Sequence, residues 1–409
     1  MSKQEKYAYL LAIAQRYAGS GRVEKGRILD EYCRTTETGR KHAIKRLGLI
    51  KRAQVLASGT GAAAQTGTNA AVAKVRTGRP PRYAADPMLI AAIHAIWESA
   101  KRPCSKRLVA LLPVWLPHYE KDCGVVLSRA SRALLKSISA ASIDRLLAAT
   151  RRAQAEKMRG LSGTTPASEW LRSLVPVRTH HHSVDRPGSV EGDTVAHCGG
   201  SIAGEFFWTL TVTDIYSAWT ECAGVWSKLA TGIKAAIISM QARLPFALRS
   251  FDSDNGTEFI NHGLHLYFAN QRPVIEFTRS RPYEKNDQAY VEQKNNSVVR
   301  QFLGYERLDN PELEEILRTF FTGCWRDYVN FFLPTLKLLR KETVGSKTRR
   351  IYEPKAQTPY QRLMKCKRIS GRTKKALRLH YETLNPFELK RQIDDTLRLI
   401  SKNARCSDL

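Results

Sequence analysis

The sequence lacks three features that would assign it to common classes of protein. It has no run of eighteen apolar residues, and its N-terminus has no signal-peptide cleavage pattern. Its eight cysteines, at positions 33, 104, 123, 198, 222, 324, 366 and 406, include no CxxC pair, so reduced thiols are expected rather than a zinc finger or zinc ribbon. We therefore expect a soluble protein of the cytoplasm.

Acidic residues are scarce relative to basic ones. There are 38 Asp and Glu residues against 66 Lys and Arg, which gives a formal net charge of +28. A polyanion is the expected partner, and nucleic acid or an anionic membrane surface would meet that charge. At 409 residues, 43% of them hydrophobic, the chain can form two to four domains with their own cores.

The N-terminal segment, 1–55, predicts three helices at 5–18, 23–32 and 40–47. A turn precedes the third helix, which carries four basic residues, Arg40, Lys41, Lys45 and Arg46. Helix, turn and basic helix is the arrangement of a helix-turn-helix domain, whose last helix enters the major groove of DNA. The alternative is an ordinary three-helix bundle with a solvated basic face.

Two further segments precede the main domain. Segment 56–85 is rich in Ala, Gly and Thr without apolar periodicity, which is typical of a flexible linker. Segment 86–152 predicts a second small helical domain, because Leu89, Ile93 and Trp97 recur at helical spacing. We interpret it as a second helix-turn-helix-like module.

From about residue 185 the pattern changes from helical to extended. Strands are predicted at 189–197, 206–215, 220–226, 248–254 and 274–277, and helices at 229–244, 258–270 and 286–303. Three consecutive strands followed by alternating helix and strand predict a mixed sheet flanked by helices, an α/β core.

Three acids fall at comparable places in this core. Asp193 lies within the first strand, Asp254 ends a later strand, and Glu292 lies on the following helix. Each alone has an ordinary interpretation, because an Asp before Asn-Gly is usually a turn residue and a Glu on a polar helix is usually solvated. Strand ends beside a helix are nevertheless where α/β sheets gather ligands. Asp214 and Asp252 are interpreted as structural.

The chemistry of such a set is metal-dependent. Carboxylate oxygens suit Mg²⁺ or Mn²⁺, and three acids in one cleft resist ionising together unless cations are present. Two such ions, roughly 3.5–4 Å apart, can clamp the attacking and leaving oxygens of a phosphoryl displacement.

The residues around the acids suit DNA. Arg279, Arg281 and Lys285 could hold phosphates, and Tyr283 could stack on a base. Asn296 and Arg300 follow Glu292 at steps of four residues, so we expect them on the same helix face and also in contact with DNA.

The motifs around the three acids are specific. Asp193 in VEGDTVAH, Asp254 in DSDNGTEF and Glu292 in NDQAYVEQKNNSVVR resemble the DDE triad of bacterial insertion-sequence transposases, which share a retroviral-integrase-type catalytic core. The resemblance covers 185–345. It implies a ribonuclease H-like fold, two Mg²⁺ (or Mn²⁺) ions, and cleavage of double-stranded DNA followed by strand transfer. It also implies a homo-oligomer acting on element ends and target DNA, in the bacterial cytoplasm at the nucleoid.

The sequence departs from retroviral integrases in two respects. No His-His-Cys-Cys zinc module precedes the core, so recognition of element ends would fall to the helical domains, and no C-terminal SH3-like barrel is evident. Two other functions remain open. One is a non-catalytic DNA-binding regulator, and the other is a ribonuclease H-like nuclease that cuts without joining.

The C-terminal part is strongly basic. After a core-packing helix predicted at 311–332, residues 337–378 contain fifteen Lys and Arg against Glu342 and Glu353. Segment 346–409 is therefore predicted to be a basic, mainly helical region that binds DNA or packs on the core, ending in an amphipathic helix at 385–402. The whole chain is expected to be multidomain, with helix-turn-helix modules before a ribonuclease H-like core and this tail after it.

Overall fold

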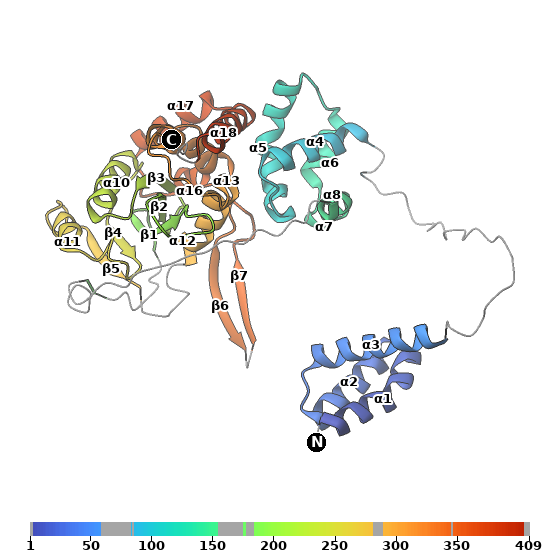
Figure 1. Cartoon of the computed structure of the whole chain (residues 1–409). Coiled ribbons are helices and arrows are strands. Elements are labelled where there is room, and N and C mark those ends of the chain that lie inside the picture. Colours follow the sequence, from blue (N-terminus) through green and yellow to red (C-terminus); the bar gives the residue numbers. More distant parts are fainter. Residues whose placement is uncertain are drawn as a thin grey trace. The chain divides into compact units, whose positions relative to one another are not determined.

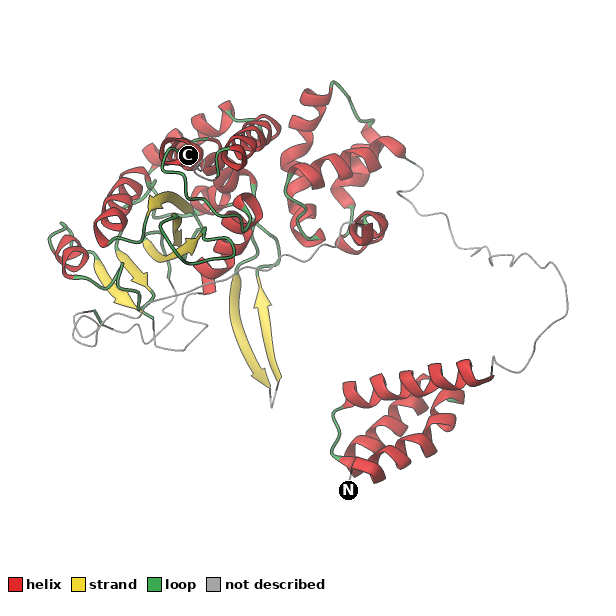
Figure 2. Cartoon of the chain, viewed as in Figure 1, coloured by secondary structure: helices red, strands yellow, loops and turns green. Residues whose placement is uncertain are grey.

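The computed structural model describes residues 3–58, 83, 86–153, 175–176, 184–280, 289–344 and 347–404. The chain forms two compact units, Met1–Arg79 and Pro80–Leu409, whose elements are labelled in Figure 1 and coloured by type in Figure 2. None of the described helices combines the length and apolar character that crossing a membrane requires.

The first unit contains a bundle of three helices. They are α1 (Lys3–Gly19), α2 (Arg22–Thr36) and α3 (Arg40–Ser58). Leu10, Ile28, Tyr32 and Leu47 are buried in their shared core, and the Tyr32 hydroxyl donates a hydrogen bond to the Lys6 carbonyl at 3.1 Å. The third helix extends eleven residues beyond its predicted end at 47. The helix-turn-helix role of this bundle stays a prediction.

The second unit is organised around a mixed five-stranded sheet. Its strands are β1 (Ser189–Ala196), β2 (Phe207–Asp214), β3 (Thr220–Trp226), β4 (Ser250–Ser253) and β5 (Glu276–Arg279). The order is β3-β2-β1-β4-β5, with β1 to β3 antiparallel and with β4 and β5 parallel to β1. The predicted mixed sheet is confirmed, and its order agrees with the ribonuclease H-like fold that the resemblance implies.

Helices cover both faces of this sheet. The elements are α10 (Ala230–Arg243), α11 (His262–Ala269), α12 (Ala289–Lys294), the π-helix η1 (Asn295–Arg300) and α13 (Gln301–Leu303). Ile233 of α10 and Leu264 of α11 pack with Val190 and Phe251 on one face, and Val298 of η1 packs with Val195 on the other. Alternation along β1 therefore places Asp193 on the face that α12 and η1 cover.

Gly192 allows β1 to pass close to β4. A Cβ at position 192 would lie 2.3 Å from the Phe251 ring, which occupies that space. Any larger residue would push apart the two strands that carry Asp193 and Asp254.

Most of the remaining helices of the second unit share a single core. The N-terminal set is α4 (Pro87–Ser99), α5 (Ser105–Cys123), α6 (Arg129–Ser137), α7 (Ala140–Leu146) and α8 (Ala148–Ala153), and the C-terminal set is α14 (Leu313–Thr322), α15 (Cys324–Asp327), the π-helix η2 (Tyr328–Phe332), α16 (Pro359–Lys365), α17 (Gly371–Thr383) and α18 (Pro386–Lys402). Trp115 of α5 joins the two sets: its indole donates to the Phe332 carbonyl at 3.2 Å and packs against Phe387 of α18. The predicted domain boundaries stay predictions, but buried side chains run continuously from α5 to α18.

Two C-terminal expectations need correction. The helix predicted at 311–332 is interrupted at Gly323, whose φ of −107° and ψ of −117° are not helical. The basic region does not begin as helix either, because β6 (Leu338–Val344) and β7 (Lys347–Tyr352) form an antiparallel hairpin, which projects from the unit in Figure 1.

Candidate functional site

The register of the sheet brings two of the three predicted acids together. In the parallel ladder between β1 and β4, Gly192 lies opposite Ser253. The residue after Gly192 is Asp193, and the residue after Ser253 is Asp254. Because neighbouring strands lie about 4.8 Å apart, residues separated by more than sixty positions in sequence become immediate neighbours.

Asp193 is held by the strand and by the helix that covers it. The backbone N–H of Thr194 donates to its Oδ1 at 2.7 Å. The side-chain amide of Asn295, the first residue of η1, donates to its Oδ2 at 2.6 Å. These bonds fix the orientation of the carboxylate and tie η1 to β1.

Asp254 sits in the turn that follows β4. Its Oδ1 accepts a hydrogen bond from the Gly256 N–H at 2.9 Å, as in an Asx turn. Burial raises the pKa of Asp254, and the carboxylate of Glu258 raises it further, while the Gly256 N–H and Lys228 act in the opposite direction. The turn thus holds a carboxyl group that ionises less readily than an exposed one.

Glu258 is a third acid beside this turn. It is only 2% exposed, and its Oε1 pairs with Lys228 at 2.5 Å and accepts from the Thr194 hydroxyl at 3.4 Å. Its Oε2 has no hydrogen-bond partner among the described residues. A Cβ at position 256 would lie 2.4 Å from that oxygen, so glycine is required there. Glu258 therefore connects β1 to the Asp254 turn.

The helix that carries Glu292 is anchored beside β1 at two points. The Val291 N–H donates to Glu191 Oε2 at 3.0 Å, and Asn295 reaches Asp193. The structure places the backbone of Glu292 in α12, between these anchors, and its side chain lies outside the described residues. Position 292 precedes Asn295 by three residues, and positions three apart lie on one face of a helix.

The donor set at this junction consists of carboxylates, which divalent cations such as Mg²⁺ prefer. Among the described side chains no group of three or more His, Cys, Asp or Glu is placed to hold a metal ion. Asp193 and Asp254 nevertheless present only oxygen donors, and a carboxylate has about four lone-pair sites, so their hydrogen bonds are compatible with a cation. Burial raises the pKa of Asp254 and the carboxylate of Glu258 raises it further, while Oε2 of Glu258 has no hydrogen-bond partner among the described residues. These residues fit Mg²⁺ or Mn²⁺.

The predicted DNA contacts of the core fare differently from the acids. The guanidinium of Arg279 donates to the Val175 carbonyl at 2.8 Å and to Asn255 Oδ1 at 2.9 Å. Arg300 donates to the Ala196 carbonyl at 2.8 Å, and Asn296 is exposed. Both arginines thus make contacts within the fold. Arg281, Tyr283 and Lys285 lie outside the described residues.

The basic residues of α3 are partly engaged within the first unit. Arg40 forms an ion pair with Asp30, and Arg46 lies over the Tyr7 ring at 4.9 Å. Lys41 and Lys45 are exposed. Their contact with DNA stays a prediction.

Sequence reasoning missed the role of Asn295. An α-helical period of four placed Asn296 and Arg300, and not Asn295, on the helix face of Glu292. The helix changes to π geometry at Asn295, and this change moves the following residues around the axis. The Asn-Asn pair itself was the only available signal.

The other buried acids serve the fold. Asp214 accepts hydrogen bonds from the Gly188 N–H and from both the N–H and hydroxyl of Ser217, although burial raises its pKa to about 6. Glu221 pairs with Arg326 at 2.7 Å and accepts from the Trp219 indole. Neither lies in the Asp193–Asp254 pair.

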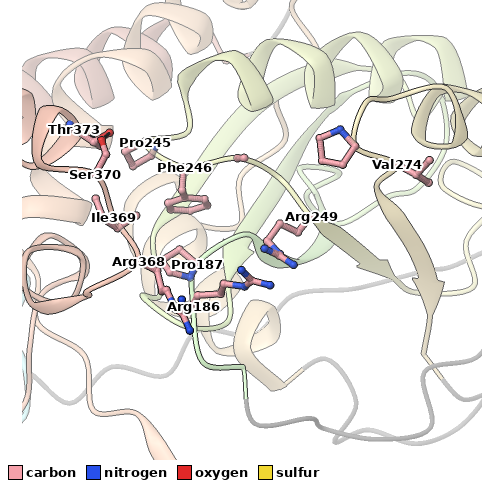
Figure 3. A pocket seen from close by; sticks show the side chains of 12 residues that line it. Arg186, Pro187, Pro245, Phe246, Arg249, Val274, Arg368, Ile369, Ser370 and Thr373 are labelled. Atoms are coloured by element: carbon pink, nitrogen blue, oxygen red, sulfur yellow. Dashed lines mark hydrogen bonds between the residues drawn. The ribbon is translucent and has the colours of Figure 1, made fainter.

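A separate cavity lies at the end of β4 opposite to Asp254. A cavity of about 450 Å³ is lined by Arg186, Arg249 and Arg368 around Phe246 (Figure 3). Arg249 precedes β4 and Asp254 follows it, so the strand's four residues, about 13 Å, separate the two places. None of the described residues that line this cavity is a carboxylate, and the cavity is distinct from the acidic site.

Comparison with known proteins gives one relative of substantial identity. No protein-family model matches the chain. The uncharacterized protein y4rM of Sinorhizobium fredii (strain NBRC 101917 / NGR234) is 37% identical over 349 residues, which cover 84% of this chain and 91% of that protein.

Two solved structures show weak similarity. The catalytic core domain of BIV integrase is 15% identical, with a TM-score of 0.28, and the match covers 42% of this chain and 91% of that one. The simian T-cell lymphotropic virus intasome in complex with PP2A regulatory subunit B56 gamma is 12% identical, with a TM-score of 0.30 and coverage of 60% and 73%. Neither score is high enough to support a conclusion.

Proposed function

We propose that this chain, which belongs to the same family as the uncharacterized protein y4rM of Sinorhizobium fredii, is a DNA transposase of the DDE type. It binds the ends of a mobile element, cleaves them in a metal-dependent reaction and joins them to target DNA.

One observation carries this proposal. Asp193 and Asp254 directly follow the paired residues Gly192 and Ser253 of β1 and β4, beside the helix of Glu292, in a protein with a net charge of +28. Acids gathered at one point of a basic protein suit divalent cations acting on a polyanion.

The residues divide the work of such a site. Asp193, Asp254 and Glu292 would hold two Mg²⁺ or Mn²⁺ ions, which when bound supply charge neutralisation at the phosphoryl group. Asn295 and the Gly256 N–H orient the carboxylates of Asp193 and Asp254. Lys228, paired with Glu258, limits the negative charge behind them.

The reaction proceeds in two displacements. Water attacks the phosphodiester at the element end, which leaves a 3′-hydroxyl on one fragment and a 5′-phosphate on the other. The 3′-hydroxyl then attacks a target phosphodiester, forming one P–O bond as another breaks. Two element ends must be brought together, so we expect the active complex to be a homo-oligomer on double-stranded DNA.

Two basic surfaces would carry the DNA. One is the three-helix bundle, through Lys41 and Lys45 of α3, which are exposed. The other is the β6–β7 hairpin, whose sequence holds Arg340, Lys341, Lys347, Arg349 and Arg350 against Glu342. A two-stranded ribbon fits the major groove, which supports this assignment.

A strand-transfer assay with labelled 3′ ends tests the function. Duplexes from the DNA that flanks the coding sequence are incubated with the full chain, target plasmid and Mg²⁺ or Mn²⁺. We expect metal-dependent nicking and joined products from wild type. Asp254→Asn should retain DNA binding and lose both. The matched control is Asp395→Asn, at a side chain of α18 that is 69% exposed, which should react as wild type does.

The other outcomes separate the rival functions. Cutting without joined products would identify a nuclease. Specific DNA binding with neither reaction would identify a regulator. Metal-dependent nicking retained by Asp254→Asn would remove Asp254 from the site.

A further inference from the structure

A second, smaller pocket lies between the α4–α5 turn and η1. It has a volume of about 150 Å³, and four of its lining residues are cationic: Lys101, Arg102, Arg107 and Lys294. No Asp or Glu of the described chain lines it. The pocket thus gathers positive charge as the β1–β4 junction gathers negative charge.

Lys294 is the central observation. It is only 5% exposed, it lines the pocket, and it makes no hydrogen bond or ion pair with any described residue. An ammonium group has three donors. Removing it from water without a partner is costly, so the pocket is the direction in which its donors can be satisfied.

Arg107 adds a second unsatisfied donor. The Nε–H of its guanidinium is buried and has no partner within the described part of the chain. Arg107 lies on α5 and Lys294 on α12, so two separate elements present unpaired cationic groups to one space. Their mutual repulsion is unfavourable, and an anion between them would relieve it.

Arg362 provides an internal contrast. It is also 5% exposed, but its guanidinium pairs with Glu353 at 2.7 Å and donates to Ser217 and Thr335. The fold therefore satisfies a buried cation where the cation serves only structure. Within the described part of the chain, Lys294 and the Nε–H of Arg107 have no such partners.

We propose that the pocket lined by Lys294, Arg107 and Lys101 binds a phosphate group. A tetrahedral oxyanion accepts hydrogen bonds in several directions, and lysine and arginine are the usual phosphate-binding side chains. The volume is about half the lower limit of roughly 300 Å³ for drug-sized ligands, so the pocket suits the oxyanion rather than a whole nucleotide. The phosphate has two possible sources, free inorganic phosphate or the terminal phosphate of a DNA strand.

This site stands apart from the carboxylates and does not rest on the proposed reaction. It does share a helix with them, because Lys294 immediately precedes Asn295, which binds Asp193. An anion that fixes Lys294 would also fix the start of η1. Phosphate binding would therefore steady the helix beside the acidic site.

Thermal unfolding of the full chain tests the first source. Inorganic phosphate is compared with chloride at equal ionic strength and pH, without divalent metal. We expect phosphate to raise the Tm of wild type by about 2–4 °C. Lys294→Met and Arg107→Gln should abolish the rise, and Lys375→Gln, an exposed lysine of α17 outside the pocket, should keep it. Arg107→Gln carries the test if Lys294→Met fails to fold.

Fluorescence anisotropy tests the second source. Duplexes that differ only in a 5′-phosphate or 5′-hydroxyl are titrated with the same variants. Preference for the 5′-phosphate that Lys294→Met removes would support the site and identify the DNA end as its ligand. The proposal is overturned if neither arm distinguishes wild type from both pocket variants.

Discussion

Two adjacent residues of one helix face opposite electrostatic surroundings. Asn295 donates to Asp193 among the carboxylates of the β1–β4 junction, whereas Lys294 lines a pocket of cationic side chains. The difference lies in how the fold treats each charge. The carboxylates of Asp193 and Asp254 accept hydrogen bonds from backbone N–H groups or an amide, whereas the Lys294 ammonium donates none to any described residue. The acidic side is organised by the protein itself, while the basic side depends on an external anion.

The largest expected effect separates the two sides by activity. Asp254→Asn removes a ligand and should lower metal-dependent nicking by at least about a hundredfold, equivalent to roughly 3 kcal/mol of transition-state stabilisation. Lys294→Met leaves every carboxylate in place and should change nicking by only a few fold. Initial rates on labelled duplex, at a fixed Mn²⁺ concentration, measure both.

Circular dichroism of both variants serves as the folding control. Equal losses of activity from two folded variants would contradict the separation, because Lys294 would then belong to the reacting site.

The next effect tests the orientation of Asp193. Asn295→Ala removes the amide that holds Oδ2, and we expect about a tenfold loss of nicking, as for other residues that position a metal ligand. Asn296→Ala is the matched control, since Asn296 is the exposed neighbour in the same π-helix. A greater loss from Asn296→Ala would favour the DNA contact expected from the sequence. The Mn²⁺ concentration for half-maximal rate should rise for Asn295→Ala alone.

Asn295 and Asn296 illustrate which features of the structure could be predicted from the sequence. The predicted bounds of β1 to β3 agree with the structure within one residue at each end. The sequence predicted a mixed sheet, but the parallel pairing of β1 with β4 comes from the structure. Asp193 and Asp254 were predicted as metal ligands from their places at strand and turn and from the family resemblance, and that role stays a prediction. Their partner Asn295 was not predicted, because a π-helical start has no periodic signature.

Other differences come from packing between distant segments. Segment 86–152 has the pattern of an independent helical domain, yet Trp115 inserts its indole against Phe332 and Phe387. Nothing in the pattern of α5 names those partners. The β6–β7 hairpin was hidden for a related reason, since its basic residues lack the alternation with apolar residues that marks a half-buried strand.

A smaller effect concerns stability. The folded-state pKa of Asp254 is raised above its ordinary value of 3.8, so the ionised form is disfavoured by folding. The contribution of Asp254 to the free energy of unfolding is therefore most favourable below its ordinary pKa of 3.8. It is lost as pH rises through the folded-state pKa. In metal-free buffer at pH 7, Asp254→Asn should raise the Tm by about 2 °C, for about 1 kcal/mol.

Melts of wild type and Asp254→Asn across pH check the sign. The rise in Tm caused by Asp254→Asn should vanish near pH 4, where the Asp254 carboxyl of wild type is also protonated. Added Mg²⁺ should stabilise wild type more than the variant, because a ligand stabilises the state that binds it. A gain that is independent of pH would show that the charge of Asp254 is not its cause.

The smallest expected effect concerns the salt dependence of DNA binding. This dependence should come from exposed cations such as Arg349 and not from the buried Lys294. Arg349 lies on β7 and is exposed, so Arg349→Ala should remove one phosphate contact and reduce the slope of log K against log salt concentration by about 0.9. Binding should weaken to a similar degree on unrelated DNA sequences, since a phosphate contact carries no sequence information. Lys294→Met should leave the slope for 5′-hydroxyl duplex unchanged, because a residue 5% exposed cannot follow the backbone of a duplex. Arg398→Ala, at a side chain of α18 that is 79% exposed, controls for loss of general charge, and an equal change from it would assign the salt dependence to net charge rather than to the hairpin.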